Sequence, residues 1–413
     1  MAQVNITLSE EEVLQVLTGD RDDALKFLLA RVVNEIMKAE SEEQLCASKH
    51  ERTEERTDYR NGFRERELTT RIGTITLQVP RHRNEPFHTM IFEQYKRSEA
   101  SLIATMVQMV IAGVSTRKVE KVVETLCGTG FSKSTVSRLC QVLDKEIEAF
   151  RSRPLDYVDA PFLMVDATYF KVREDHRIKS KAFLTVLGFR SDGMREVLDF
   201  AVYDNEDNYS WRAFFERLKK RGLQEPKLVI SDAHKSIRQA IAKVYPEAAW
   251  QRCQVHLRRN ILDVIPNKYK EGLKVELNRL FNAKTRTEAE HTLKEIVTDY
   301  EDVAPKAMEI LSNGFEDAMT IMCLPEYIRI VLRSTNILER LNRELKRRSD
   351  VIQVFPNMES VLRLMGAVTI EYSDSQLGKQ RLFTEQKYEA ISESINESFR
   401  NIAQEQVKLL EAA

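Results

Sequence analysis

The sequence has few of the residues that build disulfide or zinc scaffolds, and no stretch suited to a membrane. Its five cysteines, among 413 residues, are scattered and form no Cys-x-x-Cys pair. They are Cys46, Cys127, Cys140, Cys253 and Cys323. This argues against a disulfide-stapled fold and against a four-cysteine zinc site. No apolar run approaches the length of a membrane span, and the N-terminus lacks a signal-peptide pattern. We therefore expect a cytoplasmic protein.

The sequence also lacks a surplus of either charge. Lys and Arg total 63 and Asp and Glu total 64, so the overall charge neither favours nor excludes a nucleic-acid partner. Only local clusters of basic residues can decide that question. Hydrophobic residues at 42% and charged residues at 31% are typical of a largely helical globular protein. The length predicts two to four domains.

One carboxylate lies in the most strand-like apolar run of the chain, Phe162–Phe170. This residue is Asp166, and a buried carboxylate is costly unless it is paired, protonated or bound to a metal. Two further acids lie in suitable settings, since Asp232 ends a second apolar run and Glu339 lies in a polar helical segment. We predict that the three acids form one metal site that cuts and joins DNA.

Phosphodiester cleavage needs an activated oxygen nucleophile, an in-line leaving oxygen and neutralised phosphate charge. Two Mg²⁺ ions about 3.5–4 Å apart supply all three, and hard cations prefer carboxylate oxygens. We expect two Mg²⁺ ions, with Mn²⁺ able to substitute. Asp166 bridges them in this hypothesis, and Asp232 and Glu339 each complete the shell of one ion. A hydrolase and a DNA-joining enzyme look alike at this level.

The two flanking acids have structural alternatives. An Asp that ends a strand often caps the next helix, and Asp232 could do so before the Ala-His-Lys-Ser segment that follows it. Glu339 has a close rival in Glu344, and an ion pair with Arg340 or Arg343 is common on a solvated helix.

Cys253 and His256 are both of metal-ligand type, but no second pair lies at zinc spacing. We favour His256 as a phosphate or substrate contact beside the acids, with a core histidine as the alternative.

The order of predicted elements between residues 160 and 260 indicates the fold class. Three strand-like runs come first and alternating helices and strands follow: Phe162–Phe170, Lys181–Arg190, Met194–Tyr203, helix Tyr209–Arg221, strand Lys227–Asp232, helix Ser236–Val244 and strand Ala248–His256. This is the element order of an α/β ribonuclease-H-like core with a mixed sheet. If the run that ends at Asp232 lies beside the first strand, Asp166 and Asp232 meet near the carboxyl ends of the strands.

Basic residues gather in two parts of the N-terminal third. Between Lys49 and Arg83 the predicted phosphate contacts are Arg60, Arg71, Arg81 and Arg83, although interspersed acids leave a solvated surface as the alternative. Residues 99–150 predict three helices with short turns, which is a helix-turn-helix pattern, and an ordinary helical bundle is the alternative. In a helix-turn-helix the third helix would face the duplex with Lys133, Ser134, Ser137 and Arg138.

Several motifs, taken in order, resemble the Mutator-like transposases of bacterial insertion sequences. They are Tyr59-Arg-Asn-Gly62, Val79-Pro-Arg81, Val165-Asp166, Ser231-Asp-Ala-His234, Arg252-Cys-x-x-His256 and Thr335-Asn-x-x-Glu-Arg-x-Asn342. The resemblance implies a ribonuclease-H-like core interrupted by an all-helical insertion, with an Asp-Asp-Glu triad at Asp166, Asp232 and Glu339. It places the family's Cys-x-x-His motif on Cys253 and His256, and it favours Glu339 because an Asn follows three residues later.

The function implied by the resemblance is DNA transposition by a bacterial, cytoplasmic and nucleoid-associated enzyme. Such a protein binds the terminal inverted repeats of its element and a target DNA, acts as a homodimer or larger synaptic complex, and moves through an excised circle. Near the acids, the residues expected to contact DNA are Cys253, His256, Asn336, Arg340, Asn342 and Arg343. Two alternatives stay open: a nuclease of the same fold that joins no strands, and a catalytically idle DNA-binding repressor.

These observations predict seven segments. They are an N-terminal helical or dimerisation region (1–48), a basic DNA-contacting segment (49–98), a helix-turn-helix-like domain (99–155), the first part of the core (156–262), the all-helical insertion (263–325), the last part of the core with the catalytic Glu (326–375) and a C-terminal helical tail (376–413). No role is predicted for the tail.

Overall fold

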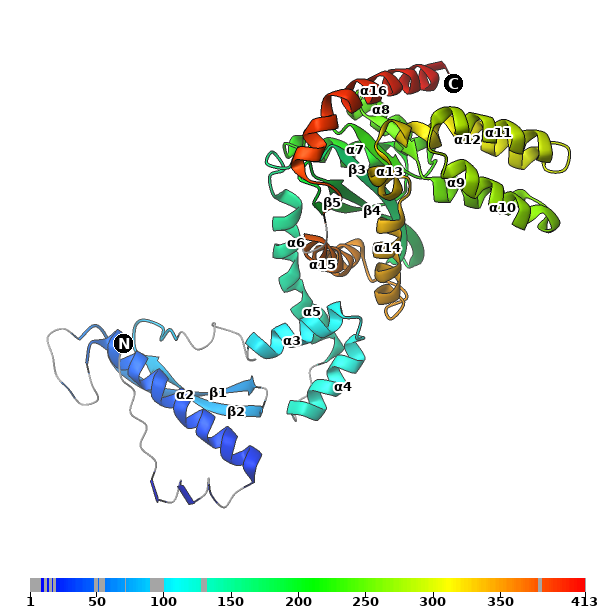
Figure 1. The fold of residues 1–413 in the computed structure, drawn as a ribbon. Helices are drawn as coiled ribbons and strands as arrows, with labels where there is room; N and C mark the ends of the chain where they lie inside the picture. Colours follow the sequence, from blue (N-terminus) through cyan, green and yellow to red (C-terminus); the bar gives the residue numbers. More distant parts are fainter. Residues whose placement is uncertain are drawn as a thin grey trace. The chain divides into compact units, whose positions relative to one another are not determined.

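The structure, a computed structural model, describes residues 9–10, 13–14, 17, 20–47, 51, 56–70, 72–89, 100–127, 132–377 and 381–412. The chain forms two compact units, Met1–Gln141 and Val142–Ala413 (Figure 1). The predicted 99–155 segment therefore spans two units. Its last helix, α6 (Leu143–Ser152), packs in the second unit against strand β5 (Arg195–Tyr203) and helix α15 (Met358–Leu377).

The first part of the N-terminal unit is a long helix on a two-stranded antiparallel sheet. Helix α2 (Arg21–Leu45) packs on strand β2 (Gly73–His82), which pairs with β1 (Arg60–Thr70). Alternate residues of β2 are buried against the helix, as expected for a half-buried strand. The sequence did not predict β1, because its first half is polar and exposed on both faces and only its pairing with β2 makes it a strand.

Three short helices form the second part of this unit: α3 (Ala100–Ile111), α4 (Thr116–Cys127) and α5 (Lys133–Leu139). Their apolar sides share a small core that includes Met106, Val119 and Val136. Ser132 caps α5 by accepting a hydrogen bond of 3.2 Å from the backbone N–H of Thr135. The three predicted helices are thus present and packed on one another.

The C-terminal unit is a mixed α/β fold built on a five-stranded sheet. In the order β5-β4-β3-β6-β7, the strands are Arg195–Tyr203, Arg177–Phe189, Phe162–Glu174, Leu228–Ser231 and Ala249–Arg252. Strand β4 pairs antiparallel with both β3 and β5, whereas β3, β6 and β7 run parallel. The predicted strand order along the chain, and the position of the strand ending before Asp232 beside the first strand, are both observed.

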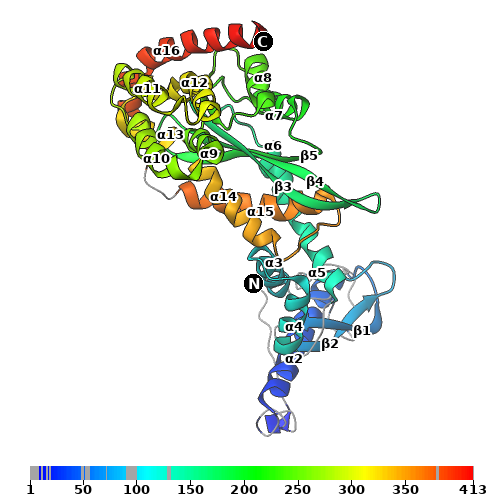
Figure 2. The ribbon, with the colours of Figure 1, turned by 90° about the vertical axis from the view of Figure 1, so that its right-hand side faces the viewer.

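Helices cover both faces of this sheet (Figure 2). Helices α7 (Asn208–Lys220) and α8 (Lys235–Val244) pack on one face through a large apolar core that contains Trp211. Helices α14 (Asn336–Ser349) and α15 lie against the other face, where α14 contacts β3 and α15 contacts β5.

The stretch between β7 and α14 is helical and has its own core. Its elements are α9 (Gln254–Val264), α10 (Asn267–Phe281), α11 (Arg286–Tyr300), α12 (Pro305–Met319), the 3₁₀ turn η2 (Thr320–Cys323) and α13 (Glu326–Leu332). Helix α12 returns the chain to the sheet, since it contacts both α9 and β7. The inserted helices therefore begin and end beside β7.

The last helix, α16 (Glu385–Ala412), belongs to the core of this unit. Phe399, Tyr388 and Phe383 surround the ring of Phe162, which opens strand β3. The carboxamide of Gln406 accepts a hydrogen bond of 2.8 Å from the backbone N–H of Trp250 and donates one of 2.9 Å to the backbone carbonyl of the same residue. Because β7 is an edge strand, this helix covers an otherwise open edge of the sheet. None of the helices in the described part of the chain is long and apolar enough to cross a membrane.

Candidate active site

The parallel pairing of β3 with β6 places Asp166 and Asp232 at equivalent positions. The register joins Phe162 with Leu228 and continues to Met164 with Ile230. Asp166 and Asp232 each lie two residues beyond that last pair, at the carboxyl end of β6. The negative charge of Asp232 is one of the influences that raise the pKa of Asp166. Asp232 Oδ1 also accepts a hydrogen bond of 3.2 Å from His234 N. His234 is the N-cap residue of α8 and no described side chain caps this helix, so the capping role considered for Asp232 is not observed.

Helix α14 brings two further polar side chains to this end of the sheet. Asn342 Nδ2 donates a hydrogen bond of 2.8 Å to Asp166 Oδ2. One turn earlier, Glu339 Oε1 lies 3.6 Å from His256 Nε2. That carboxylate oxygen is buried and accepts no hydrogen bond within the described part of the chain. Helix α14 thus contacts Asp166 on β3 through Asn342 and His256 on α9 through Glu339.

The Cys-x-x-His motif holds the start of α14 against the start of α9. The backbone N and the hydroxyl of Thr335 both donate to Cys253 Sγ at 3.4 Å. The same hydroxyl lies 3.5 Å from His256 Nδ1. Thr335 occupies the N-cap position of α14, yet its side chain does not cap the helix. Its hydroxyl is instead directed at Cys253 and His256, and this fixes the His256 ring with Nε2 towards Glu339.

The charges of this neighbourhood are strongly coupled. A hydrogen bond with Cys253 raises the pKa of His256, and the nearby Asp166 and Glu339 raise it further. Burial acts to raise the pKa of the Cys253 thiol, but the contacts with His256 and Thr335 lower it overall. Both groups thus have partners within the fold.

The pKa of Asp166 is raised to about 7, mainly because the carboxyl group is buried. The bond of 2.9 Å that it accepts from Ala167 N lowers the pKa, and the charge of Asp232 raises it. Asp166 therefore holds a proton near neutral pH when no cation is present. The charge of His256 also lowers this pKa. A divalent cation would favour the ionised form more strongly, since it would add positive charge next to the carboxyl group.

Replacing Asp166 with Asn is expected to stabilise the metal-free protein at about pH 8. The folded pKa of about 7 lies above the ordinary value of 3.8, so ionised Asp166 costs stability at high pH. The advantage of the variant should shrink as the pH falls through about 7, and vanish near about pH 4. Thermal unfolding in EDTA across this range measures it, and a difference in Tm that does not change with pH would contradict the assignment.

Glu344 gives the matched control for that experiment, because its contacts differ from those of Glu339. Its carboxylate accepts from Arg347 Nη2 at 2.6 Å and from Arg348 Nε at 2.7 Å. Hydrogen bonds from these arginines lower its pKa to about 2. Glu344→Gln should therefore shift stability in the opposite direction at high pH. The geometry favours Glu339 over Glu344 as the third acid.

The acids approach one another but do not form a closed metal cage. Among the described residues, no group of three or more His, Cys, Asp or Glu side chains is placed to hold a cation as it stands. The donor chemistry nevertheless suits a hard cation, because Asp166, Asp232 and Glu339 offer carboxylate oxygens. Glu339 Oε1, which lies 3.6 Å from His256 Nε2 but accepts no hydrogen bond from a described residue, is the acceptor that such a cation would satisfy.

The remaining predicted contact residues divide between the two units. On α14, Asn336, Arg340 and Arg343 are exposed, and neither arginine forms an ion pair with another described residue. In the N-terminal unit, the exposed predicted residues are Lys133, Ser134, Ser137 and Arg138 on α5, and Arg81 and Arg83 at the end of β2.

Arg60 differs from these exposed residues. It is half-buried, donates to Ala47 O at 2.8 Å and lies 3.5 Å from Glu42, so its guanidinium is engaged within the unit. Arg71 lies outside the described residues.

Three residues near the acids, Tyr169, Glu206 and Thr335, were not predicted from the sequence as site residues. Tyr169 donates its hydroxyl to Glu206 Oε2 at 2.7 Å, and the Trp211 indole N–H donates to Glu206 Oε1 at 3.3 Å. Glu206 is also among the charges that raise the pKa of Asp166. The strand alternation around Asp166 could have shown that Tyr169 is exposed, but nothing in the sequence indicated that the loop before α7 reaches this point. Thr335 was noted only as part of a motif.

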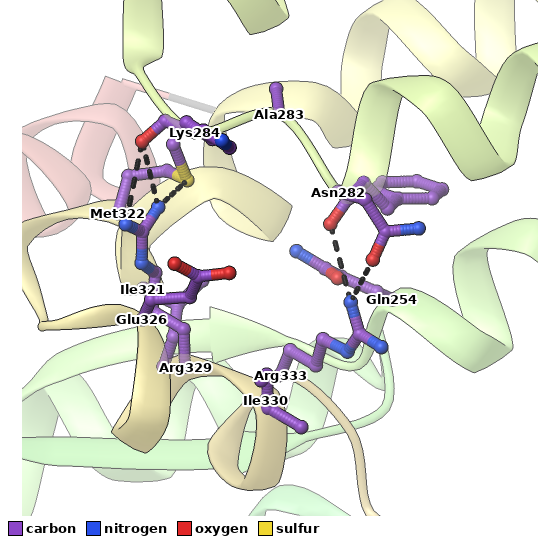
Figure 3. A pocket seen from close by; sticks show the side chains of 11 residues that line it. Gln254, Asn282, Ala283, Lys284, Ile321, Met322, Glu326, Arg329, Ile330 and Arg333 are labelled. Carbon is purple, nitrogen blue, oxygen red and sulfur yellow. Dashed lines mark hydrogen bonds between the residues drawn. The ribbon is translucent and has the colours of Figure 1, made fainter.

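The residues that line a small pocket next to Gln254 connect the inserted helices to one another (Figure 3). Arg333 donates to Asn282 Oδ1 at 2.8 Å, and Arg329 donates from both terminal nitrogens to Lys284 O at 3.3 Å. These bonds tie α13 to the end of α10, and α13 leads directly into Thr335. The insertion is thus fixed to the segment that carries Glu339.

Comparisons with known proteins identify the family of the chain. The family model described as "Transposase, Mutator family" matches residues 1–377. The transposase for insertion sequence element IS256 in transposon Tn4001 of Staphylococcus aureus is 41% identical over 386 residues, covering 93% of this chain and 99% of that protein. The transposase for ISRM5 of Rhizobium meliloti is 40% identical over 87% of this chain and 90% of its own length. The transposase for IS1081 of Mycobacterium tuberculosis is 35% identical over 92% of each chain. The chain therefore belongs to the Mutator family of transposases.

Proposed function

We propose that this protein is the transposase of an insertion sequence, which binds the terminal inverted repeats of its element and cleaves and joins DNA strands at Asp166, Asp232 and Glu339. The observation that carries the proposal is the register of β3 and β6, which sets Asp166 beside Asp232. Helix α14 adds Glu339 and the Asn342 contact to the same neighbourhood. The printed names of its relatives are those of insertion-sequence transposases.

The strand order supports a ribonuclease-H-like core, in which three antiparallel strands continue into parallel strands separated by helices. Asp166, Asp232 and Glu339 would hold two Mg²⁺ ions, with Mn²⁺ as a substitute. When bound, such ions activate the attacking oxygen and stabilise the leaving oxygen of a phosphodiester.

The residues around the acids would position them and the DNA. The hydrogen bond from Asn342 orients the Asp166 carboxylate. The contact of Thr335 with His256 Nδ1 would hold the imidazole ring with Nε2 towards Glu339. Arg340 and Arg343 are exposed one turn apart on α14, where they would contact DNA phosphates. The acids then act on a phosphate that is already held in place.

The N-terminal unit would supply recognition of the element's ends. Its exposed polar residues on α5 are arranged as in a recognition helix, and Arg81 and Arg83 add positive charge at the end of β2. Because two ends must be brought together, we propose a homodimer or larger complex with one active site for each end. An excised circular intermediate is the route that we propose.

The test is a reaction of the purified full-length protein with labelled inverted-repeat ends and a target plasmid. With Mg²⁺ we expect cleavage at the element's end, and joining of pre-cut ends to the plasmid. EDTA should stop both reactions. Cleavage without any joined product would support a nuclease, and binding without either reaction would support an idle repressor. Equal activity on a shuffled end sequence would contradict the recognition of inverted repeats.

A further inference from the structure

The sheet places Thr185 directly beside Asp166. In the antiparallel pairing of β3 with β4 the two residues are partners, and paired residues point to the same face of a sheet. The register gives one row of side chains, which runs from Asp232 through Asp166 to Thr185 and then to Phe200 on β5. Helices α14 and α15 cover this face (Figure 2). Thr185 is therefore the next side chain to Asp166 on the side away from Asp232.

Both members of this pair are exceptions in their strands. The buried stretch Ala182–Phe189 of β4 contains one polar side chain, which is Thr185, and this residue is 1% exposed. On the facing strand, the apolar run Phe162–Ala167 contains one polar side chain, which is Asp166. The single polar groups of two otherwise apolar stretches are thus partners in the register.

The hydroxyl of Thr185 has no hydrogen-bond partner. Its oxygen is buried and bonds to no described residue. Strand β4 lies between β3 and β5, so its backbone groups are used by the ladders on both sides. Phe183 and Leu187 on β4 and Phe200 on β5, which are neighbours on the same face, are apolar. A buried hydroxyl without a partner costs stability, and valine has nearly the same shape, so packing alone does not explain a threonine here.

The Asp166 carboxylate lies within reach of this hydroxyl. In antiparallel strands the Cβ atoms of paired residues are about 4.5–5.5 Å apart. Rotation about the Cα–Cβ bond of Thr185 moves the hydroxyl between the staggered positions, one of which points towards Asp166, without moving the backbone. Ala167 N and Asn342 Nδ2 take two of the about four acceptor positions of a carboxylate. Asp166 can therefore accept a third donor and still contact a cation.

We propose that Thr185 is a positioning residue, whose hydroxyl donates a hydrogen bond to Asp166 when that carboxylate holds a cation. The inference rests on the proposed function, which makes Asp166 a cation ligand. Hydrogen bonds from neighbouring groups orient the ligands of protein-bound cations, and loss of such a group typically lowers metal affinity or activity about 10–100-fold. Asn342 holds the carboxylate from α14, and Thr185 would hold it from the adjacent strand.

The experiment compares Thr185→Val with Thr185→Ser in the full-length protein. Valine keeps the shape and removes the hydroxyl, whereas serine keeps the hydroxyl and removes the methyl group. Mn²⁺ is the probe, and its binding is measured by electron paramagnetic resonance of the free ion, with Asp166→Asn as the variant that lacks the site. Cleavage and joining of the element's ends are measured in parallel, and thermal unfolding in EDTA gives the stability.

Thr320→Val is the matched control. Thr320 lies in η2, is 2% exposed, and also has a buried hydroxyl oxygen that bonds to no described residue. It does not belong to the row of side chains that contains Asp166. Its replacement should leave Mn²⁺ binding and both reactions within about twofold of wild type, because it removes only a hydroxyl without a partner.

Thr185→Val should bind Mn²⁺ about 10–100-fold more weakly than wild type and react correspondingly more slowly, whereas Thr185→Ser should stay within about threefold in both measurements. Stability should follow the opposite order, since the serine variant loses a buried methyl group and should have the lower Tm. In a packing role, the less stable variant would also be the less active one.

Wild-type Mn²⁺ affinity in Thr185→Val overturns the proposal, as does a loss in Thr185→Ser that equals the loss in Thr185→Val. An equal loss of Mn²⁺ affinity in Thr320→Val also overturns it, because the effect would then not depend on the partner of Asp166. If wild type binds Mn²⁺ no better than Asp166→Asn and joins no strands, the proposed function fails instead.

Discussion

Asp166→Asn is expected to reduce both DNA cleavage and strand joining by roughly 1,000-fold or more, while binding of the element's ends is unchanged. The asparagine has the same size and keeps one oxygen, which can accept the bond from Asn342, although it cannot also accept the bond from Ala167 N. It removes the negative charge that would hold a cation, and such charge stabilisation amounts to several kcal/mol, or about tenfold for each 1.4 kcal/mol. Gel assays of cleavage and joining, together with a binding titration, measure the two effects separately.

Two variants on α14 provide the comparison for this result. Glu339→Gln should lower the reaction as strongly as Asp166→Asn, since Glu339 is the acid placed beside His256. Glu344→Gln should leave the rate within a few-fold, because that carboxylate is engaged by Arg347 and Arg348. A strong loss with Glu344→Gln and a mild one with Glu339→Gln would reverse the assignment of the third acid. Normal activity of the Asp166→Asn variant would contradict the proposed metal site.

Phe399→Ala is expected to lower the free energy of unfolding of the C-terminal unit by about 3–5 kcal/mol, which is typical for truncation of a buried aromatic residue. Its ring is fully buried and lies 6.4 Å, between ring centroids, from Phe162. Since Phe162 opens the strand that carries Asp166, activity should fall with stability at physiological temperature. Urea unfolding of the full-length protein, followed by tryptophan fluorescence, measures the change.

Leu409→Ala is the control on the same helix. Leu409 is 66% exposed, so its truncation should change stability by no more than about 0.5 kcal/mol. If Phe399→Ala were as mild as this control, α16 would not be part of the core.

The sheet of the C-terminal unit could be predicted from the sequence because its central part is buried on both faces. The apolar runs of its strands, such as Phe162–Phe170, are interrupted by few polar residues, and Asp166 is conspicuous for that reason. The neighbouring position of the strand before Asp232 followed from the element order. Strand β1 could not be predicted in the same way, because the exposed first half of that strand has no alternation of apolar and polar residues.

The contacts that complete the candidate site depend on segments far apart in the sequence, so they could not be predicted from the sequence alone. The bond between Asn342 and Asp166, and the approach of Glu339 to His256, depend on where the inserted helices return the chain. Local periodicity places Glu339 and Asn342 on neighbouring turns, but it does not say which strand they meet. Thr335 illustrates the same point, since an N-cap threonine normally bonds its own helix.

The position of α16 affects how the chain reaches its native state. Strand β3 forms its aromatic contacts with residues that are synthesised much later, and strand β7 receives its cover from Gln406 near the end of α16. Contacts between segments so distant in sequence close slowly, and an uncovered strand edge is a template for aggregation. Ribosome-bound or prematurely terminated chains should therefore depend on chaperones, and a nonsense mutation late in the gene should yield insoluble polypeptide rather than a partly active enzyme.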